Sequence, residues 1–213
     1  MITIEKISKR DIEVKDNCIS FDTNTRICVT GRNGRGKTTL LRIIGGAILP
    51  DSGIITINSN KYMFPPRYKE KNQYLKAIQD EVFYLESTDF LYPYFSVQDC
   101  ISYYCSTSEI DMSIVKEYLR ALYFGEVLSK RICELSLGTK QKIVDSICLA
   151  SNKPLLVCDE PTIGLDIQSK EAFFDLTTQL NCGIIFSTND EWLSHKFEAR
   201  IVCSDNREVS FEK

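Results

Sequence analysis

Two short runs of residues, separated by more than a hundred positions, have the types and spacing to do chemistry on phosphate groups. The first run is Gly-Arg-Asn-Gly-Arg-Gly-Lys-Thr-Thr at residues 31–39. It matches the phosphate-loop pattern, in which successive backbone N–H groups surround phosphate oxygens and a lysine, here Lys37, reaches the outer phosphates. The second run is Leu-Leu-Val-Cys-Asp-Glu-Pro at residues 155–161. It supplies the carboxylates that the loop lacks.

The segments on either side of the loop fit this interpretation. Residues 26–30 form a short apolar run typical of a strand, and residues 38–44 have the pattern of a helix that ends at Gly45-Gly46. The helix N-terminus would add its partial positive charge to the phosphate site, and Arg32 and Arg35 would add more. The alternative is an ordinary glycine-rich turn, which the order of strand, loop and helix disfavours.

Composition limits the class of protein. With 213 residues, 43% of them hydrophobic, the chain can bury a sizeable core as one domain with an inserted subdomain. No apolar stretch approaches the length of a membrane span, and the N-terminus lacks the apolar core of a signal peptide, so we expect a cytosolic protein. The net charge of −3 argues against a nucleic-acid partner.

The cysteines point to a reducing compartment. There are nine, an odd number without a Cys-x-x-Cys pair, and most lie in apolar runs. We therefore expect them to act as small core residues. One histidine, His195, and scattered cysteine spacing offer no cluster of metal ligands.

The strand and helix patterns divide the chain into recognisable parts. Four apolar runs in the first sixty residues read as strands, at 2–5, 18–21, 26–30 and 54–58. Later strands at 82–85, 154–159, 183–188 and 200–203 alternate with helical segments, which indicates a parallel sheet with crossover helices. Residues 96–151 contain no convincing strand, and residues 112–124 have helical spacing. We predict one α/β domain over residues 1–213, with a mainly parallel sheet, an N-terminal antiparallel β part and a helical lobe at about 96–151.

A third motif makes the family resemblance specific. Residues 133–142, Cys-Glu-Leu-Ser-Leu-Gly-Thr-Lys-Gln-Lys, resemble the signature motif of ABC-transporter ATPase domains, with Leu135, Ser136, Gly138, Gln141 and Lys142 in place. The segment lies about a hundred residues after the phosphate loop and just before residues 155–161, which resemble the family's Walker B strand. Residues 164–166, Gly-Leu-Asp, match its D-loop. The resemblance spans the whole chain and implies a P-loop NTPase core.

This resemblance implies ATP and Mg²⁺ as cofactors. Backbone N–H groups of residues 33–36 would surround the phosphates, and Thr39 would support the α-phosphate. The implied phosphate contacts are Gly31, Arg32, Asn33, Gly34, Arg35, Gly36, Lys37, Thr38 and Thr39. Thr38 would coordinate Mg²⁺ and Asp159 would hold it through water, a role that explains a carboxylate at the end of a buried strand. Glu160 would polarise the attacking water.

The resemblance also implies a site shared by two chains. In the family, two ATPase domains sandwich two nucleotides, and each phosphate loop faces the partner's signature motif. Ser136 and Gly138 would then contact a nucleotide held by a second ABC ATPase domain, and Asp166 would couple the two sites. The alternative for Ser136 is a plain helix N-cap, which requires no partner.

Three positions depart from the family pattern. Asn189 stands where the family usually has a switch histidine, and an amide lacks the charge and proton exchange of imidazole, so we expect slow hydrolysis. His195 lies six residues further along the chain, and we interpret it as a surface histidine, not as a replacement for the switch histidine. The Q-loop glutamine, which meets Mg²⁺ in the family, is replaced by Glu86 or Ser87, and we favour Glu86. The stretch at residues 9–14 has no aromatic residue to stack on adenine, so GTP would compete with ATP.

We therefore expect an ATPase subunit that energises a separate integral membrane transporter, from the cytoplasmic face of the membrane. The short chain favours an exporter. The tyrosine-rich segment at residues 84–95, with Tyr103 and Tyr104, is either a docking surface for the transporter or packing of the helical lobe. One alternative is a nucleotide-dependent dimerisation switch, or the weakly hydrolysing half of a heterodimer. A soluble factor acting on ribosomes or DNA is disfavoured, because paired domains and long inserted arms are missing.

Overall fold

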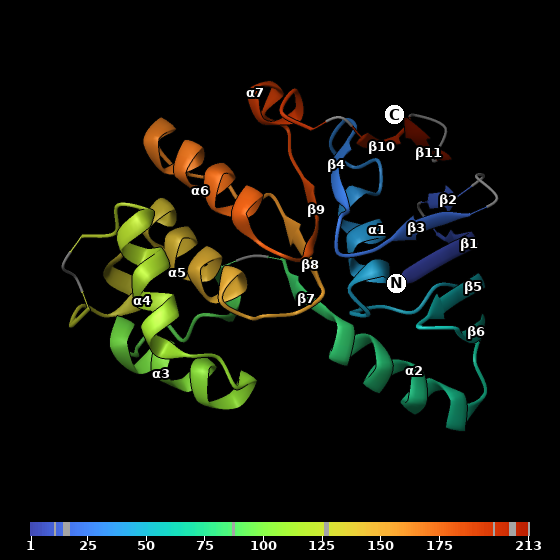
Figure 1. The fold of residues 1–213 in the computed structure, drawn as a ribbon, viewed down its shortest axis with the longest axis horizontal. Coiled ribbons are helices and arrows are strands. Elements are labelled where there is room, and N and C mark those ends of the chain that lie inside the picture. Colours follow the sequence, from blue (N-terminus) through green and yellow to red (C-terminus); the bar gives the residue numbers. More distant parts are fainter. Residues whose placement is uncertain are drawn as a thin grey trace. The chain divides into compact units, whose positions relative to one another are not determined.

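A computed structural model describes residues 1–10, 12–14, 18–86, 88–125, 128–197, 199–204 and 208–212. The chain divides into two compact units (Figure 1). The first comprises Met1–Glu86, Lys153–Asp159 and Asn181–Lys213, and the second comprises Ser87–Asn152 and Glu160–Leu180. Within the described ranges, no helix has both the length and the apolar character that a membrane crossing needs.

The first unit is built on one sheet of mixed direction. Its strands, in chain order, are β1 Ile2–Lys9, β2 Ile12–Val14, β3 Ile19–Phe21, β4 Arg26–Thr30, β5 Ser52–Ile57, β6 Asn60–Phe64, β7 Val82–Leu85, β8 Leu155–Asp159, β9 Gly183–Ser187, β10 Ala199–Cys203 and β11 Glu208–Glu212. Across the sheet the order is β6-β5-β1-β2-β11-β10-β4-β9-β8-β7, and β3 also pairs with β1. The predicted fold class is confirmed: β7, β8, β9, β4 and β10 run parallel, whereas the pairings of β1 with β2, β3 and β5 are antiparallel.

The parallel strands β4, β8 and β9 bring the polar residues at their carboxyl ends to one edge of the sheet. Because β4, β8 and β9 run in the same direction, their carboxyl ends meet at the same edge of the sheet. β8 and β9 are buried along nearly their whole length, as expected for strands covered on both faces. Asp159 lies opposite Ser187 at the end of this pair. Polar residues that end these strands are therefore brought together although they are far apart in the sequence.

Helices cover this sheet and fix its position relative to the phosphate loop. The helix α1, Lys37–Ile44, packs on β8 and β9 and buries Leu40, Leu41 and Ile43. The helix α2, Tyr68–Glu81, contacts β7 and buries Tyr74 and Ile78, and the Tyr74 ring packs against Tyr62 and Phe64 of β6. The short helix α7, Glu191–Ser194, follows β9. Burial of such apolar side chains contributes about 1.5–3 kcal/mol each, so α1 is held firmly beside the strand ends.

Several elements of the first unit were not predicted from the sequence. They are β2, β6, β11 and α2. β6 is an edge strand whose side chains are mostly exposed, Met63 among them, and it is specified by its hairpin with β5 rather than by alternation of buried apolar residues. α2 has only two buried residues on an otherwise charged surface, so its apolar periodicity is weak.

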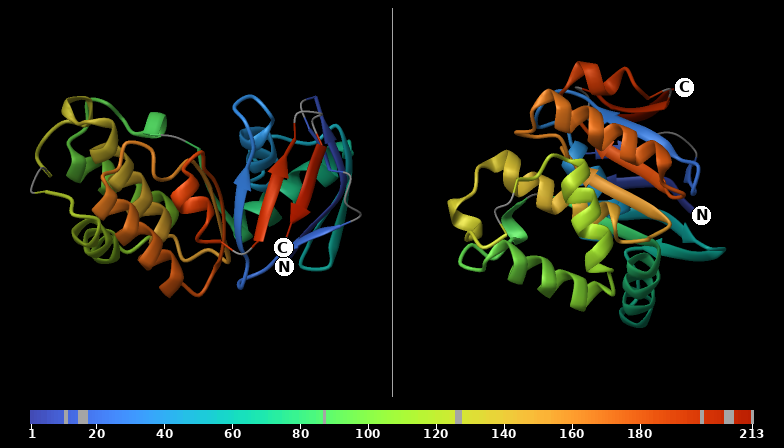
Figure 2. Two further views of the ribbon diagram at one scale, coloured as in Figure 1. Left: turned by 90° about the horizontal axis from the view of Figure 1, so that it is seen from above. Right: turned by 60° about the vertical axis from the view of Figure 1, so that its left-hand side comes forward.

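The second unit is helical among its described residues. It contains α3 Val97–Ser108, α4 Met112–Ala121, α5 Leu137–Leu149 and α6 Ile167–Gln179, with short 3₁₀ turns at Thr88–Phe90 and Ile132–Glu134. The views in Figure 2 show these helices gathered around α5, which contacts α3, α4 and α6. Ser96 caps α3 and Asp111 caps α4, because the side-chain oxygen of each accepts a hydrogen bond from a backbone N–H group in the first turn of its helix. The segment predicted as a helical lobe at residues 96–151 lies within this unit.

Candidate nucleotide-phosphate site

The phosphate loop joins β4 to α1 in the predicted order. Its backbone requires glycine at Gly31, where φ is 138° and a Cβ atom would overlap the carbonyl oxygen of Cys203. Gly36 occupies the N-cap of α1 with φ of 89°, again in the left-handed region. Residues 32–34 are exposed, and Arg35 and Thr39 are half-buried. The loop thus places exposed backbone at the positive end of α1, as an anion site requires.

Lys37 is held inside the loop by two acceptors. Its side chain belongs to a residue only 6% exposed, and its Nζ atom donates to the carbonyl of Gly31 at 2.7 Å and to Oδ1 of Asn189 at 3.1 Å. An ammonium group has three N–H donors, so these contacts leave capacity for a phosphate oxygen. Asn189, predicted as the switch position, therefore lies at the phosphate loop with its amide oxygen facing the lysine.

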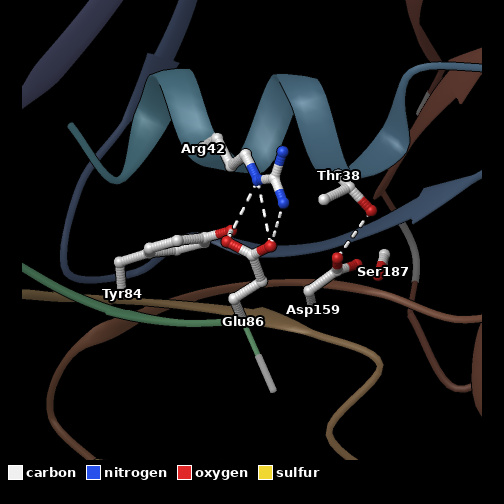
Figure 3. A network of polar contacts seen from close by, with 6 residues as sticks. All are labelled: Thr38, Arg42, Tyr84, Glu86, Asp159 and Ser187. Carbon is white, nitrogen blue, oxygen red and sulfur yellow. Dashed lines mark hydrogen bonds and ion pairs between the residues drawn. The ribbon is translucent and has the colours of Figure 1, made fainter. Parts of the chain in front are cut away.

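Thr38 and Asp159 meet beside the loop, although 121 positions separate them in the sequence. The Thr38 hydroxyl donates to Oδ2 of Asp159 at 2.6 Å, and the Ser187 hydroxyl donates to Oδ1 of the same carboxylate (Figure 3). Mg²⁺ prefers hard oxygen ligands, and it commonly takes one or two from protein while water and phosphate supply the rest. The Thr38–Asp159 pair fits this requirement. Ser187 was missed by sequence reasoning, because its role depends on the β8–β9 register.

The structure places Glu86 with Arg42 and Tyr84 rather than beside Thr38. Nε of Arg42 donates to both carboxylate oxygens of Glu86 at 3.0 Å, its Nη2 donates to Oε1, and the Tyr84 hydroxyl donates to Oε2 at 3.0 Å (Figure 3). The hydrogen bonds from Arg42 hold the pKa of Glu86 below its ordinary value. Ser87, the other candidate for this position, lies outside the described residues. The Arg42 partner was not expected from the sequence.

The described residues contain no group of three or more His, Cys, Asp or Glu side chains that could hold a metal ion. His195 is exposed, and its Nδ1 atom lies 3.3 Å from a guanidinium nitrogen of Arg200. This agrees with the surface position expected for it. The stretch expected to lack an adenine-stacking aromatic, residues 9–14, includes one residue outside the described part, residue 11.

In the second unit, the signature segment packs directly against the D-loop. A Cβ atom on Gly138 would overlap the carbonyl oxygen of Gly164, so the two backbones are in contact. Ser136 caps α5 by accepting from the N–H of Thr139 at 3.2 Å, and Asp166 caps α6 by accepting from the N–H of Ser169 at 2.9 Å. The N-termini of α5 and α6 therefore lie together.

An ion pair reinforces this arrangement. Nζ of Lys142 lies 3.4 Å from Oδ2 of Asp166 and donates to the carbonyl of Tyr123 at 3.3 Å. The backbone N–H of Ser169 is the main cause of a lowered pKa at Asp166, and Lys142 adds to it. Lys142 is nearly buried, whereas Asp166 is exposed. The lysine thus holds the D-loop carboxylate against the signature helix.

Glu160 begins the second unit and directly follows Asp159 in the chain. Its φ of 49° lies in the left-handed region, and its carbonyl accepts from the N–H of Ile163 at 3.1 Å. A non-glycine residue in this conformation is uncommon, and such residues concentrate at functional sites. The chain therefore turns sharply at Glu160 instead of continuing the direction of β8.

Comparison with known proteins agrees with this geometry. Residues 14–163 match the family model described as ABC transporter, and the chain belongs to this family. It is 36% identical over 151 residues to the cytochrome c biogenesis ATP-binding export protein CcmA of Reclinomonas americana, covering 69% of this chain and 63% of that protein. It is 34% identical over 181 residues to the molybdate/tungstate import ATP-binding protein WtpC of Pyrococcus abyssi, covering 81% of this chain and 49% of that protein.

A solved dimeric ATP-binding cassette in a post-hydrolysis state, bound to ADP and Pi, has the same fold. It aligns with a TM-score of 0.81 at 22% identity, and the alignment covers 100% of this chain and 98% of that one. The chain spans about half to two thirds of the length of the two curated relatives. At this identity the structural match establishes the fold alone.

Proposed function

We propose that this chain is the ATP-binding and ATP-hydrolysing subunit of a membrane transporter. The observation that carries the proposal is the contact between Thr38 and Asp159 at 2.6 Å, beside a loop that holds Lys37. This places a hard oxygen pair next to a cationic, N–H-rich phosphate cradle, which is the arrangement that binding of Mg²⁺ and a nucleoside triphosphate requires.

In this proposal, each site residue of the first unit has a defined role in nucleotide binding. The N–H groups of residues 33–36 bind phosphate oxygens, Lys37 neutralises the β- and γ-phosphates, and Thr39 contacts the α-phosphate. Arg32 and Arg35 add positive charge at the loop. Thr38 would coordinate Mg²⁺ and Asp159 would hold it through water, and the bound ion would neutralise phosphate charge. Phosphoryl transfer depends mainly on positioning and charge neutralisation, so few side chains are needed.

Glu160 is the proposed general base that orients the attacking water. Its support is its chain position directly after Asp159 and its left-handed backbone, which turns the residue out of the line of β8. Asn189 lacks a titratable proton, so it cannot assist by proton exchange. We therefore expect slow turnover.

The exposed surface of the second unit supports a shared, two-chain site. Around the contact of Gly138 with Gly164, three apolar residues are exposed: Leu137 at 48%, Ile163 at 45% and Ile167 at 59%. Exposed apolar side chains beside helix N-termini suit a surface that a second chain covers. We propose that Ser136 and Gly138 contact the nucleotide of a second ABC ATPase domain, and that Asp166 couples the two sites.

A cluster of aromatic rings in the second unit is the proposed docking surface for the transporter subunit. Tyr92 contacts the rings of Phe95, Tyr103 and Tyr104, while Tyr94, 80% exposed, lies beside them in the chain. The rings pack on one another and still present surface to solvent. Aromatic residues are favoured in interface cores, so this cluster fits an integral membrane partner on the cytoplasmic face. Export is the proposed direction, although the relatives include both an exporter and an importer subunit.

The test is steady-state release of phosphate from ATP by wild type, Glu160→Gln and Lys37→Ala. We expect Glu160→Gln to bind ATP without turnover and Lys37→Ala to lose binding. Activity that persists in Glu160→Gln contradicts the role of the carboxylate. Affinity isolation from membranes tests the transporter partner, and recovery of soluble proteins alone would contradict it.

A second candidate function is a dimerisation switch that binds ATP with little hydrolysis, alone or as half of a heterodimer. The contact of Asn189 with Lys37 favours it, because no proton-exchanging group occupies that position. ATP-dependent dimers without turnover in either wild type or Glu160→Gln would select this function over the first.

A further inference from the structure

The polar groups on α1 form two separate sets, one helical turn apart. Thr38 belongs to the first set, with Asp159 and Ser187, and Arg42 belongs to the second, with Tyr84 and Glu86 (Figure 3). Residues four apart in a helix lie on the same face, separated by about 6 Å of helical rise. The Glu86 carboxylate is thus held close to the Thr38–Asp159 pair without joining it.

The contacts of Glu86 use both of its carboxylate oxygens. Arg42 bonds to both of them, and Tyr84 donates to one. The Tyr84 ring is itself fixed, because a Cβ atom on Gly45 would come within 2.5 Å of its Cγ atom, so the ring lies directly against the end of α1. The Arg42 guanidinium and the Tyr84 hydroxyl therefore both donate to this one carboxylate.

The ion pair between Arg42 and Glu86 can break at a small cost in free energy. The side chains of Arg42 and Glu86 are 42% and 36% exposed, and partly exposed ion pairs are weak because water screens them. Glu86 is the last residue of the first unit, and the chain enters the second unit at the next position. The Glu86 carboxylate can therefore change its partner at the last residue of the first unit, directly after β7.

We propose that Arg42 is a positioning residue that competes with the magnesium site for the Glu86 carboxylate. With Arg42 engaged, Glu86 stays one turn from Thr38; a carboxylate released from Arg42 would be free to serve as a further oxygen ligand for Mg²⁺, which Thr38 and Asp159 would hold. The inference rests on the proposed function, because it requires Mg²⁺ and nucleotide at that pair. The charge of Glu86 is essential, since a neutral amide keeps an oxygen for the metal but loses the ionic attraction to Arg42.

The test is the Mg²⁺ dependence of equilibrium binding of a fluorescent ATP analogue to the full chain, without any measurement of turnover. Arg42→Gln frees the carboxylate, so the Mg²⁺ concentration for half-maximal binding should fall by about two- to fivefold, the range expected for a partly exposed ion pair. Arg42→Lys should restore most of the wild-type value. Tyr84→Phe, which keeps the ring against Gly45, should produce a smaller fall in the same direction.

The decisive comparison repeats Arg42→Gln in the Glu86→Gln background, where its effect should vanish. An equal shift in both backgrounds, or no shift from Arg42→Gln or Tyr84→Phe, overturns the proposal. Lys9→Gln is the matched control, because it breaks the Lys9–Asp51 ion pair of the same unit at 2.6 Å. If wild type itself binds the analogue without any Mg²⁺ dependence, the proposed function fails, and this result is distinct from a failure of the competition.

Discussion

The ammonium group of Lys37 donates a hydrogen bond to the side-chain oxygen of Asn189 at 3.1 Å. Asn189, two residues beyond the end of β9, therefore acts as an acceptor for the phosphate-loop lysine. An amide in this place can orient the lysine, but it brings no positive charge and no proton that titrates near neutral pH to the phosphates. This relationship links the unusual Asn189 to the expected slow turnover.

Asn189→His should increase the turnover number by roughly tenfold, because a positioned imidazole adds proton exchange and charge at the phosphates. Steady-state phosphate release at saturating ATP measures the effect. His195→Gln is the control, since His195 lies exposed beside Arg200, and it should leave turnover unchanged. No gain from Asn189→His would show that this position does not limit the rate.

Ser187→Ala should lower the apparent affinity for Mg²⁺ by roughly tenfold, because Asp159 loses a hydroxyl donor that orients its carboxylate. Mg²⁺ titration of ATP-analogue binding gives this value. Ser210→Ala, at an exposed position of β11, serves as control. Unchanged Mg²⁺ dependence in Ser187→Ala would mean that Thr38 alone orients Asp159.

Gly138→Ala should abolish ATP-dependent dimers while nucleotide binding by the monomer is retained. The added Cβ atom would overlap the Gly164 carbonyl and separate the signature segment from the D-loop, at a cost of about 1–3 kcal/mol in folding free energy. Light scattering with ATP and thermal unfolding report the two effects. Gly125→Ala is the matched control for Gly138→Ala, because a Cβ atom at Gly125 would meet no other atom within 4 Å. Equal behaviour of the two variants would contradict the importance of the contact.

We expect Asp145 to make the stability of the helical unit depend on pH. The side chain is fully buried on α5, accepts from Gln141 at 2.8 Å, and its Oδ2 atom has no hydrogen-bond partner among the described residues. Burial raises the pKa of this carboxyl well above its ordinary value, so the folded chain holds the proton more tightly than the unfolded chain. Its contribution to stability is complete below the unfolded pKa of about 3.9 and is lost as the pH rises through the folded pKa.

Asp145→Asn should therefore increase the free energy of unfolding by about 1–3 kcal/mol at neutral pH, and the gain should shrink toward pH 4. Urea unfolding at several pH values measures the difference. Asp80→Asn, exposed on α2, should show no such trend. A gain for Asp145→Asn that is the same at all pH values would exclude titration of Asp145 as its cause.

The sequence was sufficient to predict the elements whose signals are local. The strand, glycine loop and helix around Lys37 are contiguous, and β4 and β7 have the predicted bounds. The phosphate-loop motif and the family resemblance assign both Thr38 and Asp159 to Mg²⁺, and the structure places their side chains in contact. β6 and α2 were missed, since tertiary pairing rather than apolar periodicity specifies them.

Partner choice between polar side chains was not accessible from the sequence. Glu86 was favoured as a metal ligand, and the structure pairs it with Arg42, because the register of β7 brings the carboxylate to the second turn of α1. Lys142 was part of a motif, yet its contact with Asp166 depends on how α5 and α6 pack. Such contacts depend on distances across several elements, which spacing along the chain does not encode.

The central proposal is that this chain hydrolyses ATP at a site shared with a second ABC ATPase domain. For a pair formed by two copies of the chain, the initial rate of phosphate release as a function of chain concentration tests it most directly. At saturating ATP and Mg²⁺, the rate per chain should rise with chain concentration as dimers form, and it should be abolished in Glu160→Gln. A rate per chain that is independent of concentration, or one that survives Glu160→Gln, would contradict the account.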